Sequence, residues 1–161
     1  MDMLHLQQIF NHCFWGSERT TLEGGALEPS YRPGNPSRII FRSDYERSAL
    51  HEIAHWCLAG EHRRRLEDYG YWYSPDGRDY AKQSAFFSVE ARPQAIECIF
   101  CDAVNIAFSP SVDNFSLAIR ADCIGHFSSR IKSWKSHYEK AGLPSRAAFF
   151  LAALRPSRGS Q

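Results

Sequence analysis

The sequence lacks any hydrophobic run that approaches the roughly 20 residues of a membrane-spanning helix. Its mean hydropathy is −0.42, so no transmembrane segment is expected. Residues 1–10 lack a basic stretch followed by a long apolar one, which predicts no secretory signal. Nineteen basic and eighteen acidic residues leave a net charge of only +1, so the composition gives no reason to expect direct binding to nucleic acid or a membrane. These features indicate a cytoplasmic protein.

The cysteine pattern does not favour a disulfide framework. There are five cysteines, an odd number, and they are scattered through apolar segments. Reduced thiols in a cytoplasm fit this pattern better. Cys98 and Cys101 form a C-x-x-C pair, but they flank apolar residues inside a predicted helix, so we interpret them as core residues.

The length and composition suit one globular domain. The chain has 161 residues, of which 43% are hydrophobic and 23% charged. We expect a single domain over residues 1–154 and a polar C-terminal tail over residues 155–161. No internal repeat interrupts this organisation.

Apolar periodicity and turn residues predict a helix-rich α+β fold with a small β-sheet. Ser43 or Asp44 can cap the second helix, and Pro93 is expected to break or kink the third. Glycines and prolines over residues 24–37 predict an irregular loop, and residues 109–114 predict a turn-rich link. The remaining expected elements are helices over 4–14, 44–59, 81–105, 116–141 and 145–154, a strand over 38–41, and a strand or hairpin arm followed by a loop over 69–80.

Residues 51–55 form an H-E-x-x-H motif. Histidines at positions i and i+4 of a helix lie one above the other, so His51 and His55 can bind one metal ion together. The apolar residues of this helix form one arc, and the two histidines fall just past its edge. The motif therefore predicts a metal site where the core meets a cleft, on a helix similar to that of zincin-like proteins or metal-dependent endoribonucleases.

A third ligand is needed, and spacing alone leaves it open. His62 lies seven residues after His55, one more than in three-histidine metal sites of this kind. Glu90 and Glu97 are seven residues apart and share one face of a continuous helix. Asp76 and Asp79 are further alternatives.

Three separated blocks of the sequence resemble the bacterial elongation factor P hydroxylases. They are HEIAHWCLAG at residues 51–60, YGYWYSPDGRD at 69–79 and VEARPQA at 89–95. The resemblance covers roughly residues 4–114 and is weaker beyond them. It implies metal ligands at His51, His55 and Glu90, and it favours Glu90 over Glu97 and His62.

The resemblance implies an oxidation by a non-haem Fe(II) enzyme, although zinc or another divalent ion could occupy the same ligands in a crystal. The implied reaction is oxygen-dependent hydroxylation of the β-lysylated lysine of elongation factor P, the protein partner. Glu52 then orients ligands or relays protons. The motif by itself would instead indicate a zinc-dependent hydrolase, an endoribonuclease or peptidase, with Glu52 as general base. A non-catalytic, metal-stabilised binding module is the other alternative, and four protein ligands would be its sign.

Two further segments are candidates for binding the substrate or the partner protein. An aromatic and acidic stretch can hold a cationic side chain through cation–π contacts and carboxylates, although ordinary strand packing is the alternative. A run of three arginines after the metal helix can dock an acidic protein, although a solvated helix end is the more usual role. The substrate-binding candidates are Tyr71, Tyr73, Asp76, Arg78 and Asp79, and the docking candidates are Arg63, Arg64 and Arg65.

Overall fold

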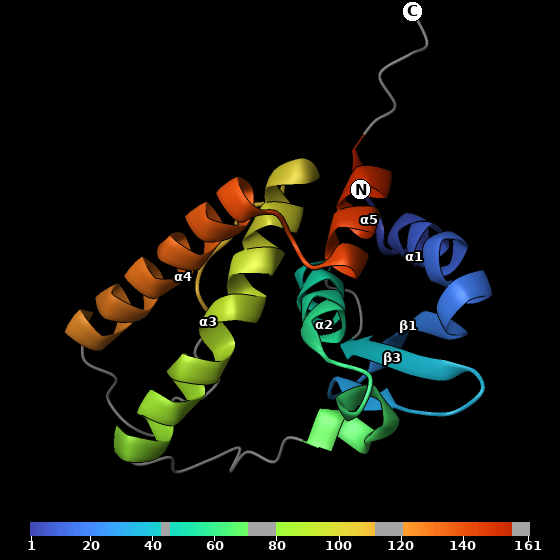
Figure 1. Cartoon of the computed structure of the whole chain (residues 1–161), viewed down its shortest axis with the longest axis horizontal. Helices are drawn as coiled ribbons and strands as arrows, with labels where there is room; N and C mark the ends of the chain where they lie inside the picture. The colour runs from blue at the N-terminus through green and yellow to red at the C-terminus, as the bar shows by residue number, and fades with distance from the viewer. Residues whose placement is uncertain (43–45, 71–79, 112–120, 156–161) are drawn as a thin grey trace, which may run out of the picture.

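The computed structural model of the chain describes residues 1–42, 46–70, 80–111 and 121–155 (Figure 1). Within these ranges the chain forms five α-helices and a three-stranded sheet, so the predicted helix-rich α+β class is confirmed. The elements in chain order are α1 (Met3–Glu18), β1 (Thr20–Ala26), β2 (Ser30–Arg32), β3 (Ser37–Arg42), α2 (Glu46–Leu58), the 3-10 turns η1 (Arg63–Arg65) and η2 (Glu67–Gly70), α3 (Tyr80–Ala103), α4 (Ala121–Ala141) and α5 (Ser145–Leu154).

The sheet has the order β1-β3-β2, with β3 parallel to β1 and antiparallel to β2. The predicted loop over residues 24–37 is therefore wrong in part, because β1 extends through its first residues and β2 lies inside it. The glycines that suggested a loop have another role. The register of β1 shifts between Glu23 and Ala26, and a Cβ atom on Gly24 would lie 2.7 Å from Cζ of Phe41. Gly24 thus lets the buried Phe41 ring pack directly under the strand.

Helix α2 lies near the centre of the molecule, with α3 and α4 on one side and the sheet and α1 on the other (Figure 1). Trp56 is fully buried and its ring lies 4.7 Å from that of Phe14 and 5.2 Å from that of Phe10. These contacts cover one side of α2, while His51 and His55 remain half-buried on another. The predicted position of the histidine pair at the edge of the core is confirmed. The buried residues of α2 are Ala49, Leu50, Ile53, Ala54, Trp56 and Cys57.

Helix α3 runs through Pro93 as one helix (Figure 1). Of the predicted break or kink, the break is therefore wrong. A proline inside a helix costs about 3 kcal/mol because its nitrogen carries no proton for the carbonyl four residues earlier. Here α3 packs between α2 and α4, and the small residues Ala91 and Ala95 on either side of Pro93 are fully buried. Tertiary packing therefore outweighs the local penalty.

The other helix predictions agree with the structure where it describes them. α1 contains the predicted residues 4–14, α2 corresponds to the predicted 44–59, and α5 has the predicted bounds. Residues 69 and 70 belong to η2, so the predicted strand is wrong there, and residues 71–79 lie outside the described residues, as do Ser43 and Asp44. Cys101 is buried and Cys98 half-buried in α3, as their interpretation as core residues predicts.

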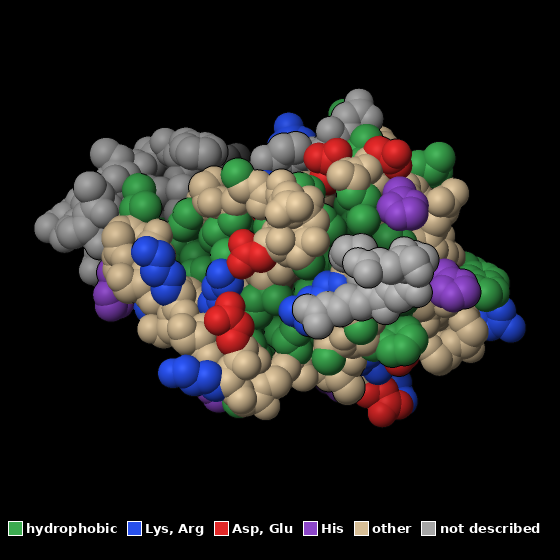
Figure 2. Space-filling model, turned by 90° about the horizontal axis from the view of Figure 1, so that it is seen from above, with side chains coloured by type: hydrophobic (Ala, Val, Ile, Leu, Met, Phe, Trp, Pro, Cys, Tyr) green, Lys and Arg blue, Asp and Glu red, His purple; other side chains and the backbone are tan. Residues whose placement is uncertain are grey.

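The surface is mixed in charge on the face that lies at the top of Figure 1. Figure 2 shows that, among the residues drawn in colour, acidic and basic side chains are scattered between hydrophobic ones on this face. No helix of the described residues is long and apolar enough to cross a membrane.

Candidate metal centre

Helices α2 and α3 pack against each other and bring three metal-binding side chains together. His51 and His55 come from successive turns of α2, and Glu90 comes from α3. One ligand atom from each lies within 4.8 Å of the other two. His55 Nε2 is 3.2 Å from His51 Nε2 and 3.0 Å from Glu90 Oε1. An ion with bonds of about 2.0–2.2 Å holds neighbouring ligand atoms at such separations.

The carboxylate of Glu90 is held in place by Gln94, one turn further along α3. Glu90 is only 4% exposed, and Gln94 Nε2 donates a hydrogen bond of 3.2 Å to its Oε2. The same amide donates to the carbonyl of Ser111 and accepts from its N–H, both at 2.9 Å. Gln94 thus fixes Oε2, while Oε1 faces His55.

Glu97 lies behind His51 and takes no place in the ligand cluster. Its Oε1 is 2.6 Å from His51 Nδ1, and its Oε2 accepts two hydrogen bonds from Arg47, at 3.1 and 3.2 Å. Because a buried carboxylate paired with arginine only accepts, Nδ1 of His51 donates and Nε2 points to the metal-binding position. This is the carboxylate–histidine arrangement that orients metal ligands in proteins.

The electrostatics of the centre match this arrangement. Burial alone would raise the pKa of Glu90, but the positive charge and hydrogen bond of His55 outweigh it and lower the pKa to about 2. Burial alone would lower the pKa of His51, but its hydrogen bond to Glu97 and the charge of Glu90 raise the pKa to about 10. The site is thus built around buried negative charge, and a cation has to balance it, either a proton or a metal ion.

His62 and Glu52 take no place in the ligand cluster, and the alternative ligands Asp76 and Asp79 lie outside the described residues. His62 is exposed at the start of η1 and is not part of the ligand cluster. Glu52 is half-buried on α2, and its charge adds to burial in raising the pKa of Tyr69. The substrate-binding candidates lie outside the described residues; they are Tyr71, Tyr73, Asp76, Arg78 and Asp79.

The three candidate docking arginines form contacts within the chain. Arg63 donates to the carbonyl of Tyr69 at 3.0 Å, and Arg64 donates to that of Ala59 at 3.1 Å. Arg65 pairs with Glu61 at 2.7 Å, with both side chains more than two-thirds exposed. Two of the three guanidinium groups therefore help to shape the turn after α2.

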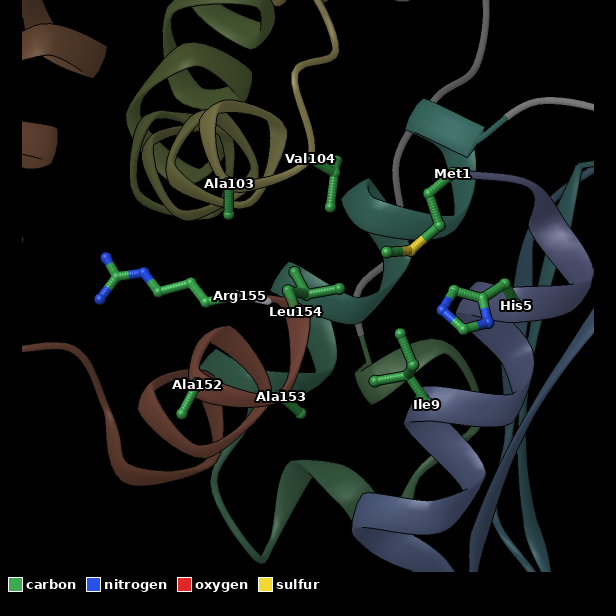
Figure 3. Close-up of a pocket in the computed structure, with 9 residues that line it drawn as sticks. All are labelled: Met1, His5, Ile9, Ala103, Val104, Ala152, Ala153, Leu154 and Arg155. Atoms are coloured by element: carbon green, nitrogen blue, oxygen red, sulfur yellow. The ribbon is translucent and has the colours of Figure 1, made fainter. Parts of the chain in front are cut away.

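A cavity of about 240 Å³ opens beside the ligand cluster, and His55 lines it together with Tyr69, Arg63 and Arg92. A larger cavity of about 740 Å³ lies between α1, the C-terminal end of α3 and α5 (Figure 3). Its lining includes Met1, Ile9 and Leu154 but none of the ligands. Of these two cavities, the smaller one thus includes a residue of the ligand cluster, His55, in its lining.

Gln94 and Arg47 were not predicted from the sequence, although a signal for both was present. Glu90, Gln94 and Glu97 are spaced i, i+4 and i+7, which places three polar side chains on one face of the helix. Arg47 precedes His51 by four residues and so lies on the same face of α2. The candidate metal centre lies where these polar faces of α2 and α3 pack against each other.

The fold and the site define a small helix-rich protein with a candidate metal centre of two histidines and one carboxylate. Residues 9–159 match the family model described as "Elongation factor P hydroxylase". The elongation factor P lysine hydroxylase of Haemophilus influenzae is 41% identical over 150 residues, which cover 91% of this chain and 83% of that protein. The chain belongs to the elongation factor P hydroxylase family.

Proposed function

We propose that this protein hydroxylates a lysine of elongation factor P, with Fe(II) held by His51, His55 and Glu90. The observation that carries the proposal is the convergence of these three side chains within 4.8 Å in a protein of this family. We take the substrate to be the β-lysylated lysine and the oxidant to be dioxygen. A reaction on a translation factor belongs in the cytoplasm.

The donor set fits iron. Two imidazoles and one carboxylate on one side of the ion leave positions open for other ligands, which is the arrangement of non-haem Fe(II) oxygenases. Iron bound there supplies the activation of dioxygen. Glu97 holds His51 in the tautomer that presents Nε2, and Gln94 leaves one oxygen of Glu90 for the ion. A structural zinc site would need a fourth protein ligand, and the cluster within the described residues has three.

We assign Glu52 a supporting role, orienting groups at the site or relaying protons. It lies on the metal helix and acts electrostatically on both His51 and Tyr69. In the substrate complex, we propose that Tyr71 and Tyr73 form an aromatic wall for the modified lysine. Asp76 and Asp79 then balance its positive charges, with Arg78 in the same stretch.

We also propose that the arginine run contributes to docking of elongation factor P. Arg65 is the most suitable of the three, because its side chain is 71% exposed and its partner Glu61 is equally accessible. Exposed ion pairs of this kind contribute about 0–1 kcal/mol, so exchanging Glu61 for an acidic group of the partner costs little. Arg63 and Arg64 would act mainly by shaping the turn.

The test is a mass measurement on β-lysylated elongation factor P. Incubation with the Fe(II)-loaded protein in air is expected to add the mass of one oxygen atom, about 16 Da. His51→Ala and Glu90→Ala should abolish this gain. His62→Ala serves as the matched control, because it removes a nearby imidazole outside the cluster, and it should retain the gain. Cleavage of RNA or peptide by the zinc-loaded protein, without any mass gain under iron and air, would overturn the proposal in favour of a hydrolase.

A further inference from the structure

Arg92 lines the same cavity as the metal ligand His55, two residues after Glu90 on α3. Its guanidinium group is held from two directions. The group lies over the ring of Trp134, 5.0 Å from the centroid, and its Nε donates a hydrogen bond of 3.0 Å to the hydroxyl of Tyr138. Both partners come from α4, so two helices fix the position of this cation.

Both of these partners are uncharged. Arg92 is exposed and has no acidic partner among the described residues. Because Nε is used for Tyr138, the two terminal nitrogens remain the free end of the planar group. That fork matches the two oxygens of a carboxylate and can bind both at once.

Among the described residues, those that line the cavity include no carboxylate. Glu90 lies in the ligand cluster, where it is buried and paired with His55. Glu52 lies close enough to act on Tyr69 but does not line the cavity. The guanidinium group of Arg92 therefore favours an anion at this end of the cavity.

We propose that Arg92 anchors a carboxylate group in the cavity beside the metal centre. The inference deepens the proposed function and rests on it for the identity of the partner protein. A carboxylate can come from two sources, a small-molecule co-substrate or an aspartate or glutamate of elongation factor P near the modified lysine. Arg92 is then a binding residue that holds the carboxylate end of the bound molecule and so fixes its orientation relative to His55.

The first experiment measures binding of a free carboxylate to the zinc-loaded protein, which is redox-inactive. Succinate is titrated while tryptophan fluorescence is followed, because Trp134 lies directly under the guanidinium group. Succinamide and 1,4-diaminobutane are the neutral and cationic probes of similar length. If the carboxylate is a small molecule, succinate binds and succinamide does not, and Arg92→Gln weakens the binding of succinate about tenfold or more without weakening that of 1,4-diaminobutane.

The second experiment measures the affinity for elongation factor P. If the carboxylate belongs to that protein, succinate does not bind, but Arg92→Gln raises the dissociation constant of elongation factor P about tenfold. Under turnover, the same variant raises KM with little change in kcat. Arg92→Lys should lose less in either experiment, because it keeps the charge and loses only the fork.

Arg19→Gln is the matched control for both experiments. Arg19 is exposed and lies 5.0 Å over the ring of Trp15, the same stacking distance, but it lies outside the cavity. Equal binding of succinate and of elongation factor P by Arg92→Gln and Arg19→Gln overturns the inference. Binding of succinate that depends on Arg92, in a protein that adds no oxygen to elongation factor P, would contradict the proposed function and leave the carboxylate site standing.

Discussion

Glu97 and His51 form a short contact across the two central helices, with Oε1 of the carboxylate 2.6 Å from Nδ1 of the imidazole. The sequence made Glu97 a candidate metal ligand, but the structure places it behind a ligand. Its second oxygen is held by Arg47, so the carboxylate is fixed at both ends. Glu97 therefore acts on the metal centre through the orientation of His51.

This relationship predicts the effect of Glu97→Gln. The neutral amide has no negative charge to pair with Arg47, and it can accept hydrogen bonds through only one of its two end atoms, so it cannot replace both contacts of the carboxylate. Because His51 is then less firmly oriented, the affinity for a divalent metal is expected to fall about 10-fold to 100-fold. Metal titration with a competing chelator measures this change. Glu61→Gln, an exposed carboxylate outside the centre, is the control and should bind metal like the wild type. An unchanged affinity in Glu97→Gln would show that this carboxylate does not support the ligand.

The contact between Gln94 and Glu90 gives a second prediction. Gln94→Leu keeps the volume of the side chain but removes the hydrogen bond to Glu90 Oε2 and both bonds to Ser111. Metal affinity should fall about tenfold, because the carboxylate loses the group that fixes one oxygen. The measurement is again metal titration, with the exposed Gln8→Leu as control. Wild-type affinity in Gln94→Leu would refute the positioning role.

The buried charges predict how the stability of the metal-free protein depends on pH. The folded-state pKa of His51 is raised from 6.5 to about 10, so its contribution is complete below pH 6.5 and is lost as the pH rises toward 10. The folded-state pKa of Glu90 is lowered from 4.5 to about 2, so its contribution is complete above pH 4.5 and is lost toward pH 2. We expect the free energy of unfolding, measured by denaturant titration, to be highest between pH 4.5 and 6.5.

The variant His51→Gln provides the control for this pH dependence. It should lose the decline in stability between pH 6.5 and 10 while keeping the decline at acid pH. If the free energy of unfolding of the wild type stays constant from pH 6.5 to 9, the assigned protonation of His51 is wrong.

Much of this centre was accessible from the sequence, because its first two ligands are local. The spacing of His51 and His55 fixes their relation as soon as the segment is a helix. The third ligand could not be derived in this way. Glu90 and Glu97 share a face of α3, so their spacing does not distinguish them. The packing of α2 against that face decides that Glu90 lies beside both imidazoles and that Glu97 contacts only Nδ1 of His51. The three-block resemblance favoured Glu90, which is the glutamate that clusters with both histidines in the structure.

The parts of the fold that were missed share one physical cause, which is that tertiary contacts override local signals. Gly24 indicates a loop by its residue type, but it lies in a strand because the ring of Phe41 packs against it. Pro93 indicates a helix end, but α3 continues because α2 and α4 pack on both sides of it. In contrast, α5 was predicted with its observed bounds, because Gly142 and Pro144 precede it and its own residues carry a regular apolar pattern.

The end of the metal helix depends on Arg146 of α5. Its Nη2 donates to the carbonyls of Cys57 and Ala59, and its guanidinium group lies 4.4 Å over the ring of Trp56. Arg146→Ala removes the donor from the carbonyl of Cys57, leaves Arg64 as the side-chain donor to that of Ala59, and removes the contact with Trp56, so we expect a loss of about 2–4 kcal/mol in the free energy of unfolding. Denaturant titration measures it, with the exposed Arg32→Ala as control. A loss below about 0.5 kcal/mol would show that α5 does not stabilise α2 through this residue.

The central claim is that one ion binds between His51, His55 and Glu90, and anomalous diffraction at the iron edge tests it most directly. Crystals of the protein loaded with Fe(II) without oxygen should show one peak, about 2.0–2.2 Å from Nε2 of each histidine and from a carboxylate oxygen of Glu90. A peak bound by Glu97 or His62 instead, or no peak between α2 and α3 at full iron loading, would contradict the account.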